Sequence, residues 1–196
     1  MKTFSNMSIV LFGLFSVMAF TSTLRIKQEV ALENPTVNPI VEMETVIEVK
    51  SVPIVVKDHT AFLNDLGHRE SGNRYDIVNT YGYMGKYQFG RKTLNGLGYR
   101  GITNEEFLNT PELQEEAMQK LLEHNRKKLR KQIEKYCGEV INGVYITESG
   151  VLAAAHLAGQ GNVKKFFRNG YEFKDGYGTK MTSYMSEFSD YKLNIY

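Results

Sequence analysis

A long amphipathic segment after residue 110 is the feature that most constrains the fold of this chain. Thr110-Pro111 is a helix-start signal, with Thr at the N-cap and Pro at the first helical position. Apolar residues then recur at intervals of about one or two helical turns, at Leu113, Ala117, Leu121, Leu122, Leu129 and Ile133. The other face is charged and includes the basic run at 126–131. We expect this run on the solvated face and at the C-terminal end of the helix, where cations favour the dipole. The alternative is a functional role, in which this basic run attracts an anionic polymer.

Three shorter helices are predicted around it. Residues 58–60 offer N-caps for a helix carrying Phe62, Leu63 and Leu66, an Ala-rich helix covers 149–157, and a short helix covers 162–168. Residues 72–101 are dense in Gly, Tyr and Asn, which favours turns and a small hairpin rather than a packing element. The sequence therefore predicts a mostly α domain with a small β-hairpin or loop region.

The chain divides into three parts. Lys2 precedes an apolar stretch from Ile9 to about Phe20, which fits the core of an export signal and is short for a membrane-spanning helix. We interpret residues 1–23 as a signal peptide, with an uncleaved N-terminal membrane anchor as the alternative. Residues 24–56 hold three of the four prolines without a helical period and read as an extended linker. Residues 57–196 form the predicted folded domain, working outside the cytoplasm.

Charge and cysteine content exclude several classes of function. The chain has 24 Lys and Arg against 22 Asp and Glu, too balanced for a nucleic-acid-binding protein. Cys137 is the single cysteine, so no intramolecular disulfide framework and no Cys-based zinc site is expected. The four histidines are scattered without a metal-binding spacing. We expect neither a metal ion nor a cofactor.

Three segments occur in an order and spacing typical of one enzyme family. Residues 66–72 read LGHRESG, residues 82–89 read GYMGKYQF, and residues 154–163 read AAHLAGQGNV. Together they make residues 60–170 resemble the lysozyme-like lytic transglycosylases, which cleave bacterial peptidoglycan. The resemblance implies a lysozyme-like helical domain with a substrate groove lined by the hairpin or loop region. It also implies peptidoglycan glycan strands as the partner, and the periplasm or cell envelope as the location, either free or anchored in the inner membrane through residues 1–23.

Glu70 is the predicted catalytic residue. Glycosidic bond cleavage requires a carboxylic acid that protonates the leaving oxygen. Glu70 lies where the first helix should end, near the partial negative charge of the helix C-terminus, which disfavours an ionised carboxylate. The alternative is a solvent-exposed glutamate paired with Arg69. Ser71 is a candidate substrate-binding residue that either orients Glu70 or caps the turn before Gly72.

The second segment supplies candidate sugar-binding groups. Gly85 would let the backbone approach a sugar closely, and Gln88 can donate to and accept from an N-acetyl group or Glu70. We expect Tyr83 and Gln88 to lie nearer the groove than Phe89.

The third segment departs from the family pattern. Where the family has Tyr-Asn, this chain has His156-Leu157. His156 can orient the substrate or assist proton transfer, since imidazole exchanges protons near neutral pH. A histidine satisfied within the core is the other interpretation.

The position of a second carboxylate separates the possible reactions. The resemblance implies one glutamate that acts as acid and then base, forming a 1,6-anhydro ring. A hydrolytic muramidase on the same fold would use Asp76 or Asp175 as helper. A catalytically silent wall-binding or scaffold protein is the rival from another class, supported by His156-Leu157.

Overall fold

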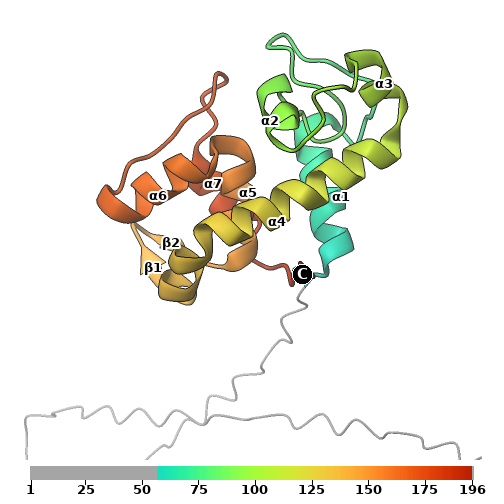
Figure 1. The fold of residues 1–196 in the computed structure, drawn as a ribbon. Helices are drawn as coiled ribbons and strands as arrows, with labels where there is room; N and C mark the ends of the chain where they lie inside the picture. Colours follow the sequence, from blue (N-terminus) through green and yellow to red (C-terminus); the bar gives the residue numbers. More distant parts are fainter. Residues whose placement is uncertain (1–56, 196) are drawn as a thin grey trace, which may run out of the picture. The chain divides into compact units, whose positions relative to one another are not determined.

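The chain enters its first helix at Asp58, whose Oδ1 accepts a hydrogen bond from the backbone N–H of Ala61 at 2.8 Å. The computed structural model describes residues 57–195, and the predicted signal (1–23) and linker (24–56) lie outside them. This part of the chain is mostly helical, as predicted, with seven helices and one two-stranded antiparallel hairpin (Figure 1). In chain order these are α1 (His59–Ser71), α2 (Arg91–Gly96), α3 (Asn104–Asn109), α4 (Pro111–Tyr136), β1 (Val140–Ile141), β2 (Val144–Tyr145), α5 (Glu148–Ala158), α6 (Gln160–Asn169) and α7 (Met181–Glu187).

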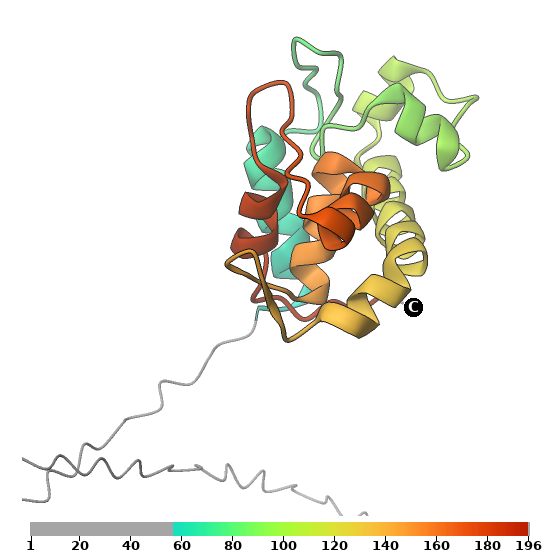
Figure 2. The ribbon, with the colours of Figure 1, turned by 90° about the vertical axis from the view of Figure 1, so that its left-hand side faces the viewer.

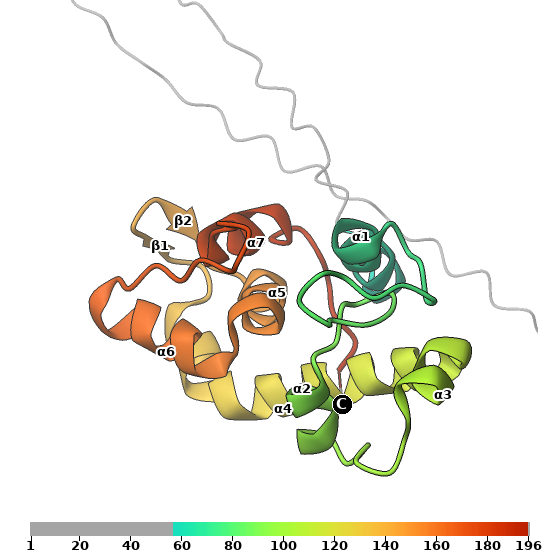
Figure 3. The same ribbon diagram turned by 90° about the horizontal axis from the view of Figure 1, so that it is seen from above.

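The long helix α4 connects the two ends of the domain. Seen from the side and from above, it runs from α3 to the β1–β2 hairpin (Figures 1 and 3). It buries a stripe at helical spacing, formed by Ala117, Met118, Leu121, Leu122 and Leu129. Each of the larger side chains contributes about 1.5–3 kcal/mol when fully buried. The predicted helix is therefore confirmed, but it continues to Tyr136, so the basic run at 126–131 does not lie at its C-terminal end.

Helix α5 lies at the centre of the second half of the domain. Every residue from Ser149 to Ala155 is buried, as expected of a helix that is apolar on all sides. Its closest neighbour is α7: a Cβ placed on Gly150 would lie 2.3 Å from the backbone oxygen of Met185. Only a glycine permits that approach. The predicted helices at 149–157 and 162–168 correspond to α5 and α6, with bounds that differ by one or two residues.

The hairpin prediction was wrong in its position. The β structure of residues 72–101 is limited to the isolated antiparallel bridges Val78–Met84 and Met84–Phe89, whereas the hairpin lies at 140–145. Its turn is Asn142-Gly143, with φ of 51° and 80°. An Asn-Gly pair between two apolar dipeptides is the usual signal for such a turn, because both central residues need positive φ.

The segment 72–101 also packs more than predicted. Met84, Tyr87, Phe89 and Leu94 are all at most 2% exposed, so this irregular segment supplies part of the core. The expectation that it is not a packing element is therefore wrong. Residues 84–87 are all buried, so the segment packs on more than one side although it forms no regular ladder.

Three short helices were not predicted from the sequence. For α3 a signal was present, since the Thr103 hydroxyl accepts from the backbone N–H of Glu106 at 3.1 Å, the first half of a capping box. Helices α2 and α7 have no side-chain cap hydrogen bond. Among the described helices, none is both long enough and apolar enough to cross a bilayer.

Replacing Gly150 by Ala should destabilise the domain by about 1–3 kcal/mol, because the added methyl group meets a backbone atom that cannot rotate away. Gly161→Ala is the matched control: Gly161 also lies in a first helical turn, and a Cβ there has nothing within 4 Å. It should leave stability unchanged or raise it by up to about 1 kcal/mol. Urea denaturation measures both, and equal effects would contradict the proposed α5–α7 contact.

Candidate active site

Glu70 lies in the last turn of α1, at the wall of a groove. Helix α1 ends at Gly72, which has a φ of 68° and whose N–H bonds to the carbonyl of His68 at 2.8 Å. The side chain of Glu70 is 13% exposed, so it does not face open water. The groove has a volume of about 490 Å³ and is lined by Arg69, Glu70, Asn79, Tyr81, Tyr83, Gln88, His156, Leu157, Phe173, Asp175, Gly176, Tyr177, Thr179 and Tyr184.

One oxygen of the Glu70 carboxyl group faces two side chains from other helices. The Tyr184 hydroxyl, on α7, donates to Glu70 Oε1 at 2.6 Å. His156 Nε2, on α5, lies 3.7 Å from the same oxygen. Burial raises the pKa of Tyr184 well above its usual range, and the nearby charge of Glu70 raises it further. Tyr184 therefore remains a protonated donor at any ordinary pH.

Arg69 does not pair with Glu70. Its Nη1 lies 2.9 Å from Glu187 Oε2, and its guanidinium carbon lies 4.7 Å from the centre of the Tyr184 ring. The cation is thus held by a neighbouring carboxylate and an aromatic face. The alternative interpretation of Glu70, an exposed glutamate paired with Arg69, does not fit this geometry.

His156 is buried, and its hydrogen bonding is incomplete. Its side chain is 6% exposed, and its Nδ1 is buried with no hydrogen-bond partner among the described residues. The Phe89 ring packs against it edge-on at 6.0 Å. A histidine satisfied within the core would have partners for its ring nitrogens. His156 instead directs Nε2 toward Glu70 in the groove.

Two loops form the aromatic walls of the groove and contact each other: the first contains Tyr81 and the second contains Tyr177. Tyr81 and Tyr177 pack edge to face with ring centres 4.9 Å apart, and the Tyr81 hydroxyl donates to the carbonyl of Gly176 at 3.3 Å. Figures 1 and 2 show both loops at the same end of the domain. The first loop is braced by Asn79, whose Oδ1 accepts from the backbone N–H groups of Tyr81 and Tyr83.

The predicted sugar-binding residues divide into two groups. Tyr83 and Gln88 line the groove, and Phe89 is buried away from it, as expected. Gln88 Nε2 already donates to the carbonyl of Gly85 at 2.9 Å, so its amide is fixed. Ser71 and Gly85 do not line the groove.

Ser71 and Gly85 hold the loop in place instead. The Ser71 hydroxyl accepts from the N–H of Arg74 at 3.0 Å and lies 2.8 Å from the carbonyl oxygen of Lys86, so it caps the turn and ties it to the loop. A Cβ on Gly85 would lie 2.0 Å from Gln114 Oε1, so Gly85 faces α4 rather than the groove. Ser71 thus has the turn-capping role that was one of its two expected alternatives, whereas the expected approach of Gly85 to a sugar is wrong. Both placements have the same cause: the segment 84–87 is packed between α1 and α4.

The groups on α4 that hold this loop were missed by sequence reasoning. Gln114 is fully buried; its Oε1 accepts from the N–H of Lys86, and its Nε2 donates to the carbonyls of Tyr75 and Phe107. Glu115 accepts from Lys86 Nζ at 2.7 Å and from two tyrosine hydroxyls at 2.6 Å, those of Tyr75 and Tyr87. Gln114 and Glu115 both lie in α4, which the sequence predicts as an amphipathic helix, and no neighbouring residue or motif indicates that they hold a distant loop.

Asp175 lies in the groove and Asp76 does not. Asp175 lines the groove from the loop that contains Tyr177. Its Oδ1 accepts hydrogen bonds from the backbone N–H groups of Tyr177 and Thr179 at 2.9 and 2.7 Å. Asp76 is exposed and is not a groove residue. Asp175 is thus the second carboxylate that the groove offers.

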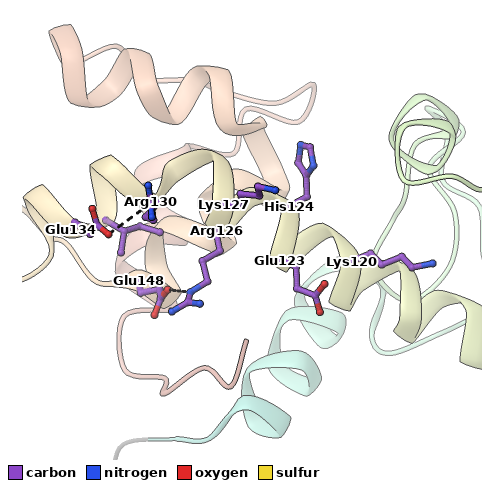
Figure 4. A pocket seen from close by; sticks show the side chains of 9 residues that line it. Lys120, Glu123, His124, Arg126, Lys127, Arg130, Glu134 and Glu148 are labelled. Atoms are coloured by element: carbon purple, nitrogen blue, oxygen red, sulfur yellow. Dashed lines mark hydrogen bonds and ion pairs between the residues drawn. The ribbon is translucent and has the colours of Figure 1, made fainter. Parts of the chain in front are cut away.

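No candidate metal site is found in residues 57–195. No three His, Cys, Asp or Glu side chains gather there in a way that could hold a metal ion. A larger hollow, of about 550 Å³, lies along α4 (Figure 4). It is lined mainly by charged side chains, of which Arg126 is bound to Glu148 at 2.6 Å and Arg130 faces Glu134 at 3.9 Å.

Comparison of the chain with protein-family models, with curated proteins and with solved structures gives no match. Each of the three sequence segments contributes to the groove: Glu70 comes from the first, Tyr83 and Gln88 from the second, and His156 from the third.

The Glu115 cluster predicts a specific loss of stability in acid. Burial alone would raise the pKa of Glu115, but hydrogen bonds from Lys86, Tyr75 and Tyr87 outweigh it and lower that pKa. A lowered pKa stabilises the fold above the pKa of the unfolded chain, and this stabilisation is lost as pH falls through the folded-state pKa. Glu115→Gln should therefore cost about 1–3 kcal/mol at pH 7 and progressively less below about pH 4.

Urea denaturation at a series of pH values measures this difference. The control is Glu112→Gln, an exposed position on the same helix, which should change stability by at most about 0.5 kcal/mol. A Glu115→Gln cost that stays the same from pH 7 to pH 3 would show that the cluster is not held by the ionised carboxylate.

Proposed function

We propose that this protein is a peptidoglycan lytic transglycosylase, which cleaves the β-1,4 bond between N-acetylmuramic acid and N-acetylglucosamine with Glu70 as its catalytic acid and base. The observation that carries the proposal is the shielded carboxyl group of Glu70 in a groove walled by aromatic side chains. The order of the three sequence segments is the second support, and with it we propose a lysozyme-like arrangement for the domain.

The lining of the groove suits a sugar polymer. Tyr81, Tyr83 and Tyr177 are exposed by 45–64%, and such rings pack on the apolar faces of pyranose units. The amides of Asn79 and Gln88 lie among them and can bond hydroxyl or N-acetyl groups. Apolar surface with a few polar groups in fixed positions is what a specific ligand site requires.

The proposed reaction uses the two oxygens of Glu70 differently. Oε1 is held by Tyr184, and no described side chain hydrogen-bonds Oε2, so Oε2 is the atom that presents the proton. That proton passes to the glycosidic oxygen as its bond to C1 of the muramyl residue breaks, which leaves an oxocarbenium-like centre. The N-acetylglucosamine unit departs with the new hydroxyl group.

The second half of the reaction restores the acid. The Glu70 carboxylate removes the proton from the 6-hydroxyl of the same muramyl residue, and the 6-oxygen bonds to C1 to close the 1,6-anhydro ring. No water is consumed and no second carboxylate is needed. Tyr184 keeps Oε1 in a fixed position during both transfers, since its own pKa is far too high for it to lose its proton.

His156 takes the place of the tyrosine in the family pattern. From α5 its Nε2 faces the Glu70 carboxyl group at 3.7 Å, beyond hydrogen-bond distance, so Nε2 remains available to bond a substrate group. We propose that it orients the N-acetyl group of the muramyl residue, which helps to stabilise the oxocarbenium-like centre. The hydroxyl that the family has at this point is supplied next to Glu70 by Tyr184.

Asp175 keeps one alternative open, a hydrolytic muramidase. It is the other carboxylate in the groove, as a hydrolase requires for activating water or forming a covalent intermediate. Its Oδ1 is occupied by two backbone N–H groups of its own loop, which is the arrangement of a turn-forming aspartate.

Digestion of purified peptidoglycan sacculi, followed by mass spectrometry, tests the proposal. The wild-type protein should release muropeptides that end in 1,6-anhydro rings, each lighter by one water than the reducing-end product. Glu70→Gln should lower the rate by a factor of about 10²–10⁴, because the amide cannot donate the proton. The same substitution at Glu139, an exposed position, is the control. A wild-type protein with no wall digestion would overturn the enzyme assignment.

The Asp175→Asn variant separates the two reactions. A transglycosylase should still form anhydro ends, because Asp175 takes no part in its proton transfers. A muramidase would form reducing ends in the wild type and lose most of its activity in this variant. Reducing ends from the wild-type protein would exclude the proposed mechanism.

A further inference from the structure

The cations of α4 that precede its last turn fall into two sets. Lys120, Arg126 and Arg130 each have a carboxylate within 4 Å, at Glu116, Glu148 and Glu134 respectively. Figure 4 shows the last two of these ion pairs. Within the described residues, Lys127, Lys128 and Lys131 have no such partner, although all three are exposed on the same helix.

The helix dipole does not account for the unpaired set. Favourable interaction of cations with the dipole is confined to the last turn, and α4 continues to Tyr136. Lys135 lies in that turn, whereas the unpaired lysines precede it. Lys127 and Lys131 stand four residues apart, a spacing at which like charges repel and weaken a helix. Their clustering therefore costs stability and calls for another explanation.

A lysine from a second helix joins the cluster. A hollow of about 350 Å³ is lined by Lys127, Lys128, Arg130, Lys131, Gln132 and Lys164. Lys164 belongs to α6, and its Nζ is 3.2 Å from the neutral side-chain oxygen of Gln160. Five cations thus line one concave site that contains no carboxylate. Arg130 keeps much of its charge available, since it and Glu134 are 3.9 Å apart and mostly exposed.

We propose that this hollow, the α4–α6 basic site, binds a linear polymer that carries repeated phosphate groups. Lysine ammonium groups bind phosphate oxygens as point charges, and the guanidinium group of Arg130 can bond a phosphate group through two N–H donors. The site is a hollow of about 350 Å³ that takes its cations from two helices, which suits a chain lying in it better than the flat surface of a membrane. The chain's formal charge is only +2, so the attraction is local rather than a property of the whole protein.

The proposal is independent of glycan cleavage. None of the residues that line the α4–α6 basic site also lines the groove that contains Glu70. Binding there would hold the protein on an anionic polymer while the groove remains free. Failure of one proposal therefore leaves the other intact.

Fluorescence polarisation with end-labelled inorganic polyphosphate as the probe tests the site. The triple variant Lys127→Gln, Lys131→Gln and Lys164→Gln should bind at least tenfold more weakly than wild type. Its salt dependence should also be shallower, by about 2 in the slope of log K against log salt concentration, because three phosphate contacts are lost.

The matched control removes the same charge from another part of the surface. Lys92, Lys180 and Lys192 are exposed, and replacing all three by Gln should change the affinity less than twofold. Circular dichroism confirms that both variants remain folded. Equal weakening by both triples would show diffuse attraction and overturn the proposal. Tighter binding of wild type to vesicles of anionic phospholipid than to polyphosphate would overturn it in favour of a membrane.

Discussion

The groove depends on how the chain is held at Lys86. Its backbone N–H donates to Gln114 Oε1 at 2.8 Å, its carbonyl oxygen lies 2.8 Å from the Ser71 hydroxyl, and its ammonium group contacts Glu115 at 2.7 Å. These contacts join the end of α1 and the first turns of α4 to a loop that has no regular hydrogen-bond ladder of its own. Since buried polar groups cost about 1–3 kcal/mol each when left unpaired, the loop has one favourable position.

With the loop in that position, the proposed catalytic Glu70 and the proposed sugar-binding residues Tyr83 and Gln88 line the same groove. Glu70 precedes Ser71, so the anchor that fixes the loop also fixes the carboxyl group relative to Tyr83 and Gln88, which lie on that loop. From the other half of the domain, α5 and α7 add His156 and Tyr184, and Gly150 lets these two helices lie close together. An acid on one helix end is thus surrounded by groups from three separate stretches of chain.

The features that could be predicted from the sequence are those encoded by neighbouring residues, such as helix caps. The caps at residues 58–60 and at Thr110-Pro111 located the starts of α1 and α4, and the Ala-rich stretch located α5. The expected position of Glu70 at the end of the first helix followed from the first of these caps. For Ser71 the turn cap, one of its two expected roles, is the one found. The expected role of Gly85 was wrong, because a glycine near a site can make room for a neighbouring helix as well as for a ligand. Tyr184 was missed because it lies 114 residues from Glu70 and no motif contains it. The hairpin at Asn142-Gly143 did carry a signal that was overlooked.

A crystal structure of the Glu70→Gln variant with a bound oligomer of alternating N-acetylglucosamine and N-acetylmuramic acid would show whether Glu70 can protonate a glycosidic bond. We expect a sugar chain along the aromatic walls, with the oxygen of one glycosidic bond within hydrogen-bond distance of the side chain at position 70 and an N-acetyl group beside His156. A glycan bound at another face of the domain, or one that runs through the groove without approaching position 70, would contradict this expectation.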